Sequence, residues 1–181
     1  SDIKKENAMH FVREQALFDN RYDAGRQLAA QLGKYKGQSV VVVAIPNGGV
    51  PIALEIALAL EADLDLVISR KIPLPLNPEA GFGAVADDGT VILNEEVVKG
   101  AGLSQHQINY QVNQVRAKIR QRSLLYRKDK PLPVVSDKTV IIIDDGLASG
   151  FTMMATVESV RRRQSKEIVV AVPVTSDSAL K

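Results

Sequence analysis

The sequence of 181 residues contains no cysteine and no tryptophan, and aromatic residues of all kinds make up only 4% of it. Without cysteine, the chain can form neither disulfide bonds nor thiolate metal sites, which is typical of a reducing compartment. We therefore expect a cytoplasmic protein. The shortage of aromatic rings argues against a surface on which nucleic-acid bases stack, so nucleic acid is not an expected partner.

Large net charge and long apolar runs are also absent. The formal net charge is +2, which is too small to indicate a polyanionic partner by itself. No uninterrupted apolar run has the length of a membrane span, and no signal peptide is recognisable, so we expect no membrane partner. With 45% hydrophobic and 24% charged residues, the composition is that of an ordinary globular protein. The length favours a single domain over residues 1–181.

What the sequence does contain is an apolar run followed by two acids and a loop of small residues. Val140–Ile143 is β-branched throughout, which is typical of a central strand covered on both faces. Asp144 and Asp145 follow at the expected carboxyl end of that strand, where open α/β sheets bind ligands. The next residues, 146–152, can turn tightly ahead of a helix and expose backbone N–H groups and the Ser149 and Thr152 hydroxyls. Such a cup suits a phosphate monoester.

Two plainer interpretations of this stretch exist. The first is a structural strand, turn and helix with a solvated pair of aspartates. The second is a receiver domain, which also carries paired acids after an apolar strand, but near its amino terminus. The complete order of residues from Val140 to Thr152 favours a sugar phosphate, whose hydroxyls bind the carboxylates while its phosphate binds the loop.

A second loop has similar character. Ser39–Ile45 reads as another buried strand, and Pro46, Asn47, Gly48 and Gly49 connect it to an apolar helix over 50–60. A glycine-containing turn between a parallel strand and a helix is again an anion-binding arrangement. The alternative is a purely structural turn.

Strands expected near 40–45, 64–69, 84–93, 140–144 and 168–173 alternate with helices, which predicts an α/β fold with a doubly wound parallel sheet. Right-handed crossovers place the first of these strands beside the fourth. The loops at 46–49 and 144–152 would then meet at a switch point of the sheet.

Other elements follow from local patterns. We expect helices at 10–18, at about 20–32 with Asp19 or Asn20 as cap, from Ser104 to about 130, and from Phe151 to about 164. A hairpin is expected at 81–94 around a turn at 87–89. Residues 72–78 are proline-rich and read as an irregular loop, part of a lid or insert at about 70–103. The 104–130 helix is strongly basic, which favours a solvated or dimer-facing surface over a nucleic-acid contact.

The residues at 144–152, Asp-Asp-Gly-Leu-Ala-Ser-Gly-Phe-Thr, resemble the 5-phosphoribosyl-1-pyrophosphate (PRPP) signature of the type I phosphoribosyltransferases. More narrowly, they look like a prokaryotic subgroup of predicted phosphoribosyltransferases. The 46–53 segment resembles the pyrophosphate loop of that family. Phe18–Ala29 is similar to the opening of the same subgroup. For most of its residues an amphipathic helix covering a sheet edge is the favoured interpretation, and Arg21 is the residue of most functional interest.

The resemblance implies a type I phosphoribosyltransferase-like core, Mg²⁺ bound with PRPP, and a homodimer active in nucleotide metabolism. It implies that PRPP or a nucleoside monophosphate is the ligand. Asp144 and Asp145 would bind the ribose, and Asp144 could also contact Mg²⁺, since no side-chain cluster suggests a separate metal site. The implied 5-phosphate ligands are Gly146, Leu147, Ala148, Ser149, Gly150, Phe151 and Thr152, and the implied pyrophosphate ligands are Pro46, Asn47, Gly48, Gly49, Arg70 and Lys71.

Three departures from the family pattern leave two functions open. The family usually has Arg or Lys where this chain has Asn47, and many purine-specific members have Asp at the position of Ala148. The sequence also stops soon after the last strand, which implies a small, incomplete hood over the acceptor. The chain is therefore expected to be either a transferase that moves the phosphoribosyl group to an unidentified nitrogenous acceptor and releases pyrophosphate, or a non-catalytic sensor of PRPP or nucleotides.

Overall fold

The computed structural model describes residues 9–15, 18–128, 130–147 and 150–174. The chain divides into two compact units, which are described separately. Unit 1 comprises Ser1–Leu66, Pro133–Ala148 and Val160–Lys181, and unit 2 comprises Val67–Leu132 and Ser149–Ser159. In the described part of the chain, no helix combines the length and the apolar character needed to cross a membrane.

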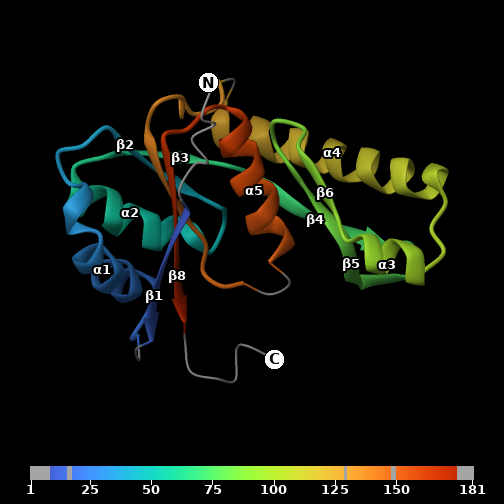
Figure 1. Cartoon of the computed structure of the whole chain (residues 1–181), viewed down its shortest axis with the longest axis horizontal. Helices are drawn as coiled ribbons and strands as arrows, with labels where there is room; N and C mark the ends of the chain where they lie inside the picture. The colour runs from blue at the N-terminus through green and yellow to red at the C-terminus, as the bar shows by residue number, and fades with distance from the viewer. Residues whose placement is uncertain (1–8, 16–17, 129, 148–149, 175–181) are drawn as a thin grey trace, which may run out of the picture. The chain divides into compact units, whose positions relative to one another are not determined.

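Unit 1 is built on a five-stranded parallel sheet (Figure 1). From one edge to the other, its strands are β1 (Met9–Gln15), β8 (Glu167–Val174), β7 (Thr139–Ile143), β2 (Val40–Ala44) and β3 (Asp63–Leu66). The predicted parallel α/β sheet is therefore confirmed. So is the placement of the 40–45 strand beside the 140–144 strand, with Ala44 opposite Ile143.

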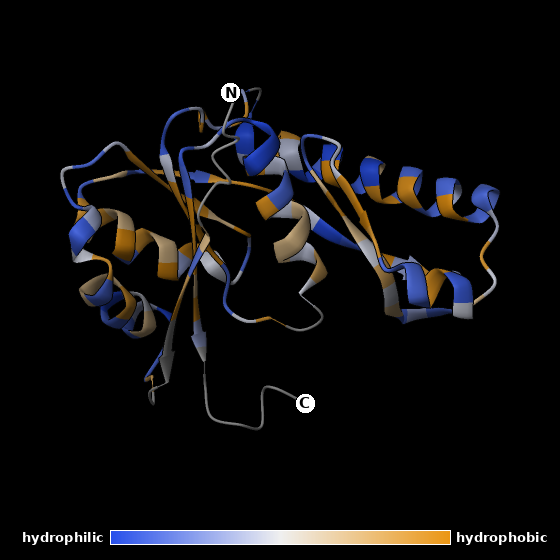
Figure 2. Cartoon of the chain, viewed as in Figure 1, coloured by the Kyte–Doolittle hydropathy of each residue, from blue (hydrophilic) through white to orange (hydrophobic). Residues whose placement is uncertain are grey.

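The two central strands are apolar because both of their faces are buried. Every residue of β2 and β7 is buried, as a strand in the middle of a parallel sheet requires. One face packs against helices α1 (Arg21–Gln31) and α2 (Gly49–Leu60), which contribute Leu28, Ile52 and Ile56 to the core. Figure 2 shows the apolar character of α2 and of the strands. The sheet thus holds the two loops that follow β2 and β7 on a rigid base.

The predicted N-terminal cap of helix α1 is confirmed at Asn20. Its side-chain oxygen accepts a hydrogen bond from the backbone N–H of Asp23 at 3.0 Å, which satisfies one of the unpaired donors of the first turn. The helix therefore begins at Arg21, which is the first residue of α1.

Unit 2 contains a three-stranded antiparallel sheet in the order β4 (Ser69–Leu74), β5 (Asn77–Ala86) and β6 (Val91–Leu93). Helix α3 (Glu95–Gly100) follows β6, and the long helix α4 (Gln105–Arg127) follows α3. Ser104 caps α4 with a capping box completed by Gln107. The apolar stripe predicted for this helix is confirmed, because Ile108, Val112, Val115 and Ile119 pack with Phe82 and its neighbours.

Helix α5 and strand β8 are the last two elements of the described chain. Helix α5 covers Phe151–Arg162 and strand β8 covers Glu167–Val174, close to their predicted bounds. A 3₁₀ turn at Gly33–Tyr35 joins α1 to the segment before β2. Residues 175–181 lie outside the described residues, so the expected small hood stays a prediction.

Three predictions about unit 1 and unit 2 were wrong. Residues 10–18 were expected to be helical, but Met9–Gln15 forms the edge strand β1, because pairing with the buried strand β8 outweighs local helix propensity. Residues 72–78 are not an irregular loop: β4 and β5 form a hairpin there. Proline is tolerated because β4 is an edge strand whose register shifts around Pro73.

The third wrong prediction concerns the strand expected near 84–93. Its residues belong to β5 and β6, which pair antiparallel in the sheet of unit 2 and take no part in the parallel sheet. The predicted hairpin over 81–94 is confirmed. Helix α3 was missed, although Asn94 caps it and Glu95 and Glu96 occupy its first turn, which together are a recognisable start signal.

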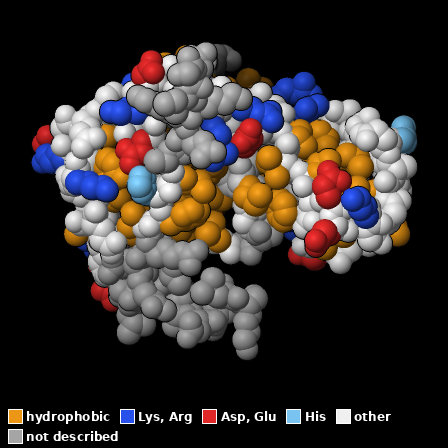
Figure 3. Space-filling model, in the orientation of Figure 1, with side chains coloured by type: hydrophobic (Ala, Val, Ile, Leu, Met, Phe, Trp, Pro, Cys, Tyr) orange, Lys and Arg blue, Asp and Glu red, His pale blue; other side chains and the backbone are white. Residues whose placement is uncertain are grey.

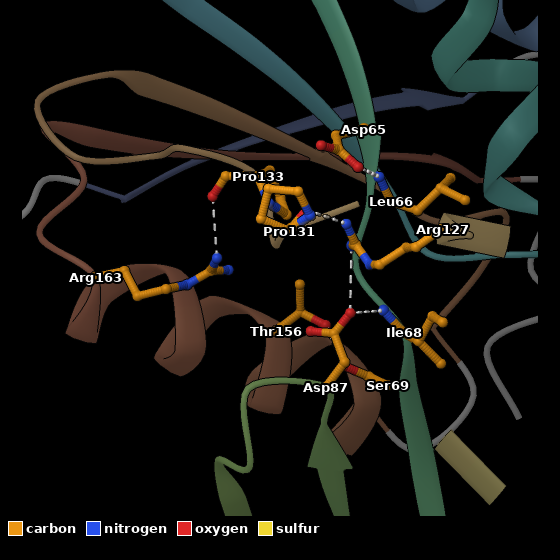
Figure 4. A network of polar contacts seen from close by, with 10 residues as sticks. All are labelled: Asp65, Leu66, Ile68, Ser69, Asp87, Arg127, Pro131, Pro133, Thr156 and Arg163. Atoms are coloured by element: carbon orange, nitrogen blue, oxygen red, sulfur yellow. Dashed lines mark hydrogen bonds and ion pairs between the residues drawn. The ribbon is translucent and has the colours of Figure 1, made fainter. Parts of the chain in front are cut away.

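A buried ion pair ties the end of α4 to the β5–β6 turn (Figure 4). The Arg127 guanidinium lies 3.4 Å from the Asp87 carboxylate, and the two side chains are only 5% and 2% exposed. Arg127 also donates to the Pro131 carbonyl at 3.1 Å, and Asp87 accepts from the Ile68 backbone N–H at 3.0 Å. Each charge is therefore supported by further hydrogen bonds, which a desolvated ion pair requires.

Removing one member of this pair should destabilise unit 2 strongly. We expect Arg127→Met to lower the free energy of unfolding by about 3–5 kcal/mol, because it leaves the Asp87 charge buried without its partner. Urea unfolding followed by circular dichroism measures the change.

Two further variants act as controls for this prediction. Arg120→Met lies on the exposed side of the same helix and should change stability by less than about 0.5 kcal/mol. The double variant Arg127→Met/Asp87→Leu should recover most of the loss, since neither charge is then left alone. Equal, small effects of Arg127→Met and Arg120→Met would contradict the account.

Candidate functional site

The two loops predicted to bind anions begin at adjacent strands of unit 1. The backbone N–H of Ile45 donates to the Ile143 carbonyl at 2.9 Å, so the β2–β7 pairing continues to the very start of both loops. Strand β7 ends at Ile143, and the chain turns at Asp144 and Asp145. Pro46–Gly49 and 144–147 therefore lie side by side at the carboxyl edge of the parallel sheet, where ligands of open α/β sheets bind.

The glycines of the first loop lie where this loop comes close to Asp145 and to the end of β7. A Cβ atom on Gly48 would collide with the carboxylate of Asp145, and a Cβ atom on Gly49 would lie 2.6 Å from the Ile143 carbonyl oxygen. Neither glycine has a positive φ, so the need is for space and not for an unusual backbone conformation. The glycine pair lets the start of α2 pack directly against the end of β7.

Among the described residues, one ion pair joins this site to helix α1, and it links Asp145 to Arg21. Its Oδ2 accepts hydrogen bonds from Arg21 Nη2 at 2.9 Å and Nε at 3.3 Å. The side chain of Asp145 is 37% exposed and that of Arg21 is 58% exposed. An ion pair at this exposure stabilises the fold by only about 0–1 kcal/mol. A ligand that offers Asp145 better hydrogen bonds can therefore displace Arg21 at small cost. The resemblance had singled out Arg21, but nothing in the sequence showed that Asp145 is its partner.

Asp144 is the more buried of the two acids. Its pKa is raised from 3.8 to about 7, chiefly by burial and in part by the neighbouring Asp145 charge, while the hydrogen bond from the Asp145 backbone N–H, at 2.8 Å to Oδ1, opposes the shift. Its pKa therefore lies close to neutral pH. A hydroxyl or a cation of a bound ligand would favour the ionised carboxylate.

The loop before α2 brings no positive charge of its own. Asn47 is exposed, and the N–H groups of Gly49 and Val50 donate to backbone carbonyls, each at 3.2 Å. Arg21 of unit 1 brings a positive charge close to these loops. It pairs with Asp145, and Gly48 packs against the carboxylate of Asp145. Arg21 thus places a positive charge beside a loop that has none of its own.

In unit 2, Gly150 has the positive φ of 79° that favours glycine, and its carbonyl accepts from the Met154 N–H at 2.9 Å as α5 begins. Phe151 and Thr152 form the first turn of that helix and are half-buried. Ala148 and Ser149 lie outside the described residues. The predicted start of the helix at Phe151 is confirmed, and the phosphate role of these residues stays a prediction.

The predicted basic pair of unit 2, Arg70 and Lys71, lies on β4. Both residues line a pocket of about 400 Å³ together with Thr152 and with Lys118 and Arg122 of α4. Burial, and then the Arg122 charge, lower the pKa of Arg70. Sequence reasoning did not assign Lys118 or Arg122 to a site; the only signal was the concentration of basic residues over 104–130.

The described residues contain no cluster of three or more side chains that could hold a metal ion by themselves. Asp144 and Asp145 nevertheless fit Mg²⁺, which proteins often bind through one or two carboxylates and the oxygens of a phosphorylated ligand. Positive and negative side chains are interspersed on the face seen in Figure 3, in keeping with the small net charge.

The structure defines an α/β fold with a parallel sheet and two loops at the carboxyl edge of its adjacent strands β2 and β7. Within that class, the sequence model of the phosphoribosyl transferase domain matches residues 15–181. The chain belongs to the phosphoribosyl transferase domain family.

Individual relatives agree with this assignment. Proteins from two strains of Mycobacterium tuberculosis, each named "Putative phosphoribosyl transferase", are 37% identical over 161 residues, which is 89% of this chain and 36% of theirs. The chain thus spans about a third of the length of the curated relatives it matches.

Solved structures show the same fold. The TT1426 protein of Thermus thermophilus is 33% identical with a TM-score of 0.74, covering 91% of this chain and 78% of that one. A hypoxanthine phosphoribosyltransferase of Staphylococcus aureus has a TM-score of 0.55 at 16% identity, covering 92% of this chain and 69% of that one. At this identity the second likeness concerns the fold alone.

The raised pKa of Asp144 predicts a specific dependence of stability on pH. Because the folded protein holds this proton up to about pH 7 and the unfolded chain releases it near 3.8, stability falls as the pH rises between these values and levels off above them. In Asp144→Asn this contribution is absent. We therefore expect the variant to gain stability relative to the wild type as the pH rises towards 7.

Urea unfolding of both proteins at several pH values measures this difference in the free energy of unfolding. Asp63→Asn, a change at an exposed acid in the same unit, is the control and should show no such trend relative to the wild type. A wild-type-to-Asp144→Asn difference that does not change with pH would show that Asp144 titrates as an ordinary exposed acid.

Proposed function

We propose that this chain binds PRPP and transfers its phosphoribosyl group to a nitrogenous acceptor, with release of pyrophosphate. The observation that carries the proposal is the side-by-side position of the 46–49 loop and the Asp144–Asp145 turn at the ends of β2 and β7. A ligand with sugar hydroxyls and an adjacent diphosphate suits an acidic turn next to a glycine-containing turn at a helix start. Membership of the phosphoribosyl transferase domain family supports the same ligand.

In the proposed complex, Asp144 and Asp145 accept hydrogen bonds from the ribose hydroxyls. The hydroxyls replace Arg21 on Asp145, which the exposed position of that ion pair permits. Arg21 then becomes available to the pyrophosphate and compensates for the missing charge at Asn47. Residues 146–152 bind the 5-phosphate, and Pro46–Gly49 with Arg70 and Lys71 bind the pyrophosphate.

The reaction would be a displacement at C1 of the ribose. The acceptor nitrogen forms a bond to C1 with its lone pair, the C1–O bond to pyrophosphate breaks, and the electron pair leaves with the pyrophosphate. Positive charge develops on the sugar and negative charge on the leaving group, so the contribution of the protein is mainly positioning and electrostatic stabilisation. Mg²⁺ bound to PRPP oxygens, with Asp144 as its carboxylate partner, would neutralise part of the leaving-group charge.

A second candidate function is a sensor that binds PRPP or a nucleotide without turnover. Asn47 favours it, because this residue brings no charge to the pyrophosphate loop. Ala148 favours it too, since no carboxylate stands there to accept a proton from an acceptor base. Homodimer formation and a cytoplasmic location also stay predictions.

A pyrophosphorolysis screen distinguishes the two functions. The full chain is incubated with pyrophosphate, Mg²⁺ and each of a panel of nucleoside monophosphates, and PRPP formation is measured. The transferase account predicts PRPP from at least one nucleotide, and loss of that activity in Asp145→Asn. Tight PRPP binding with no turnover of any nucleotide would instead favour the sensor.

The assignment of Asp144 and Asp145 to the ribose predicts that each of the two aspartates contributes strongly to PRPP binding. Loss of a charged hydrogen bond in Asp144→Asn or Asp145→Asn should cost roughly 1.5–3 kcal/mol, about ten- to a hundredfold in affinity. Calorimetric titration with PRPP and Mg²⁺ measures the effect. Melting curves show whether each variant is folded.

Asp65→Asn, at the end of strand β3, is the matched control and should bind PRPP as the wild type does. Wild-type affinity in both Asp144→Asn and Asp145→Asn would remove the ribose assignment.

A further inference from the structure

The pocket of unit 2 is cationic on more than one side. Arg70 and Lys71 project from β4, and Lys118 and Arg122 lie one turn apart on α4. The hydroxyl-bearing residues Ser69 and Thr152 line it as well, and no acidic side chain is among its described lining residues. Four like charges thus surround about 400 Å³ with no counter-charge in the described wall.

Several other arginines of the described chain have acidic partners. Arg21 pairs with Asp145, Arg26 with Asp23 and Glu55, and Arg127 with Asp87. Among the described residues, Arg70, Lys118 and Arg122 form no ion pair with an acid, while Lys71 donates to the Glu79 backbone carbonyl at 2.5 Å. The Arg122 charge and burial together lower the pKa of Arg70. An anion from outside the chain is what would relieve this repulsion.

The lining also indicates what kind of anion fits. The apolar parts of the wall come from Pro73, Pro78 and Val115, and its described residues offer no aromatic ring to stack on a base. Guanidinium groups bind phosphate oxygens with two parallel hydrogen bonds, and ammonium groups add point charges. The volume of the pocket lies at the lower end of the range for small-molecule sites. A ligand with several charges, few apolar groups and small size matches these features.

We propose that this pocket binds a linear oligophosphate and that Lys118 and Arg122 of α4 are its unassigned ligands. The oligophosphate is either the pyrophosphate part of PRPP or a free oligophosphate. The inference extends the proposed site to which Arg70 and Lys71 belong, and to that extent it rests on the proposed function. Its test uses a ligand without ribose, so it can fail or succeed independently of that function.

The probe is inorganic tripolyphosphate, titrated calorimetrically into the full chain without Mg²⁺. The test variant is Lys118→Gln/Arg122→Gln. The control is Arg120→Gln/Lys128→Gln, which removes the same charge from exposed positions at the same helix outside the pocket. We expect the test variant to bind at least about tenfold more weakly, as the loss of charged hydrogen bonds implies, and the control to stay within about twofold of the wild type.

Folding of the test variant is checked by its melting temperature, which should not fall, because both changes reduce repulsion. Arg122→Glu is a second variant: it should pair with Arg70 and abolish binding without loss of stability. Tripolyphosphate affinity equal to that of the wild type in the test variant would overturn the proposal. An equal loss in the test and control variants would also overturn it, since binding would then follow surface charge in general.

Two further experiments identify the source of the oligophosphate and separate this inference from the proposed function. Competition between tripolyphosphate and PRPP would identify the pocket as holding the pyrophosphate part of PRPP, and simultaneous binding would identify a separate oligophosphate site; either outcome supports the pocket. Asp145→Asn should weaken PRPP and leave tripolyphosphate unchanged. If PRPP binding is absent while tripolyphosphate binds through Lys118 and Arg122, the proposed function fails and this inference stands.

Discussion

The pairing of β2 with β7 is the constraint on which the candidate site depends. Because the two strands are parallel neighbours, the loops that follow them must leave the sheet at the same edge. The hydrogen bond between Ile45 and Ile143 continues this pairing to the first residue of each loop. Gly49 then has to be a glycine, since a side chain there would meet the backbone at the end of β7, and Gly48 lies directly against the Asp145 carboxylate. The site is therefore a consequence of strand order as much as of its own residues.

Two ion pairs among the described residues differ strongly in burial. The Arg127–Asp87 pair is almost fully buried and is held by further hydrogen bonds to backbone groups, which suits a permanent structural role. The Arg21–Asp145 pair is partly exposed and contributes little to stability, so its members can exchange partners. Asp144 lies between these extremes, with a pKa of about 7 that a ligand can shift. Exchangeable charge is concentrated at the loops that the proposal assigns to PRPP.

Much of the fold of unit 1 was predictable because its signals are local and strong. The uninterrupted β-branched runs of β2 and β7 and the Asn20 cap each specify one structure in the sequence itself, and the Ser104 capping box does the same in unit 2. The edge strand β1 could not be recognised in the same way, since its conformation is decided by pairing with β8, more than 150 residues away. The β4–β5 hairpin was hidden by prolines that an edge strand tolerates.

The candidate site was predictable in its loops and not in its side-chain partners. The small residues and the acid pair point to 46–49 and 144–152, but the contact of Arg21 with Asp145 joins residues 124 positions apart. The alignment of Lys118 and Arg122 with Arg70 likewise depends on how α4 packs on β4, which hydrophobic periodicity alone does not determine.

The central claim is that the ends of β2 and β7 hold a single PRPP molecule. A crystal structure of the chain with PRPP and Mg²⁺ tests it most directly. The account predicts ribose hydroxyls within hydrogen-bond distance of Asp144 and Asp145, the diphosphate beside Asn47 to Gly49, and Arg21 released from Asp145. A structure with PRPP bound elsewhere, and with the Arg21–Asp145 pair intact, would contradict it.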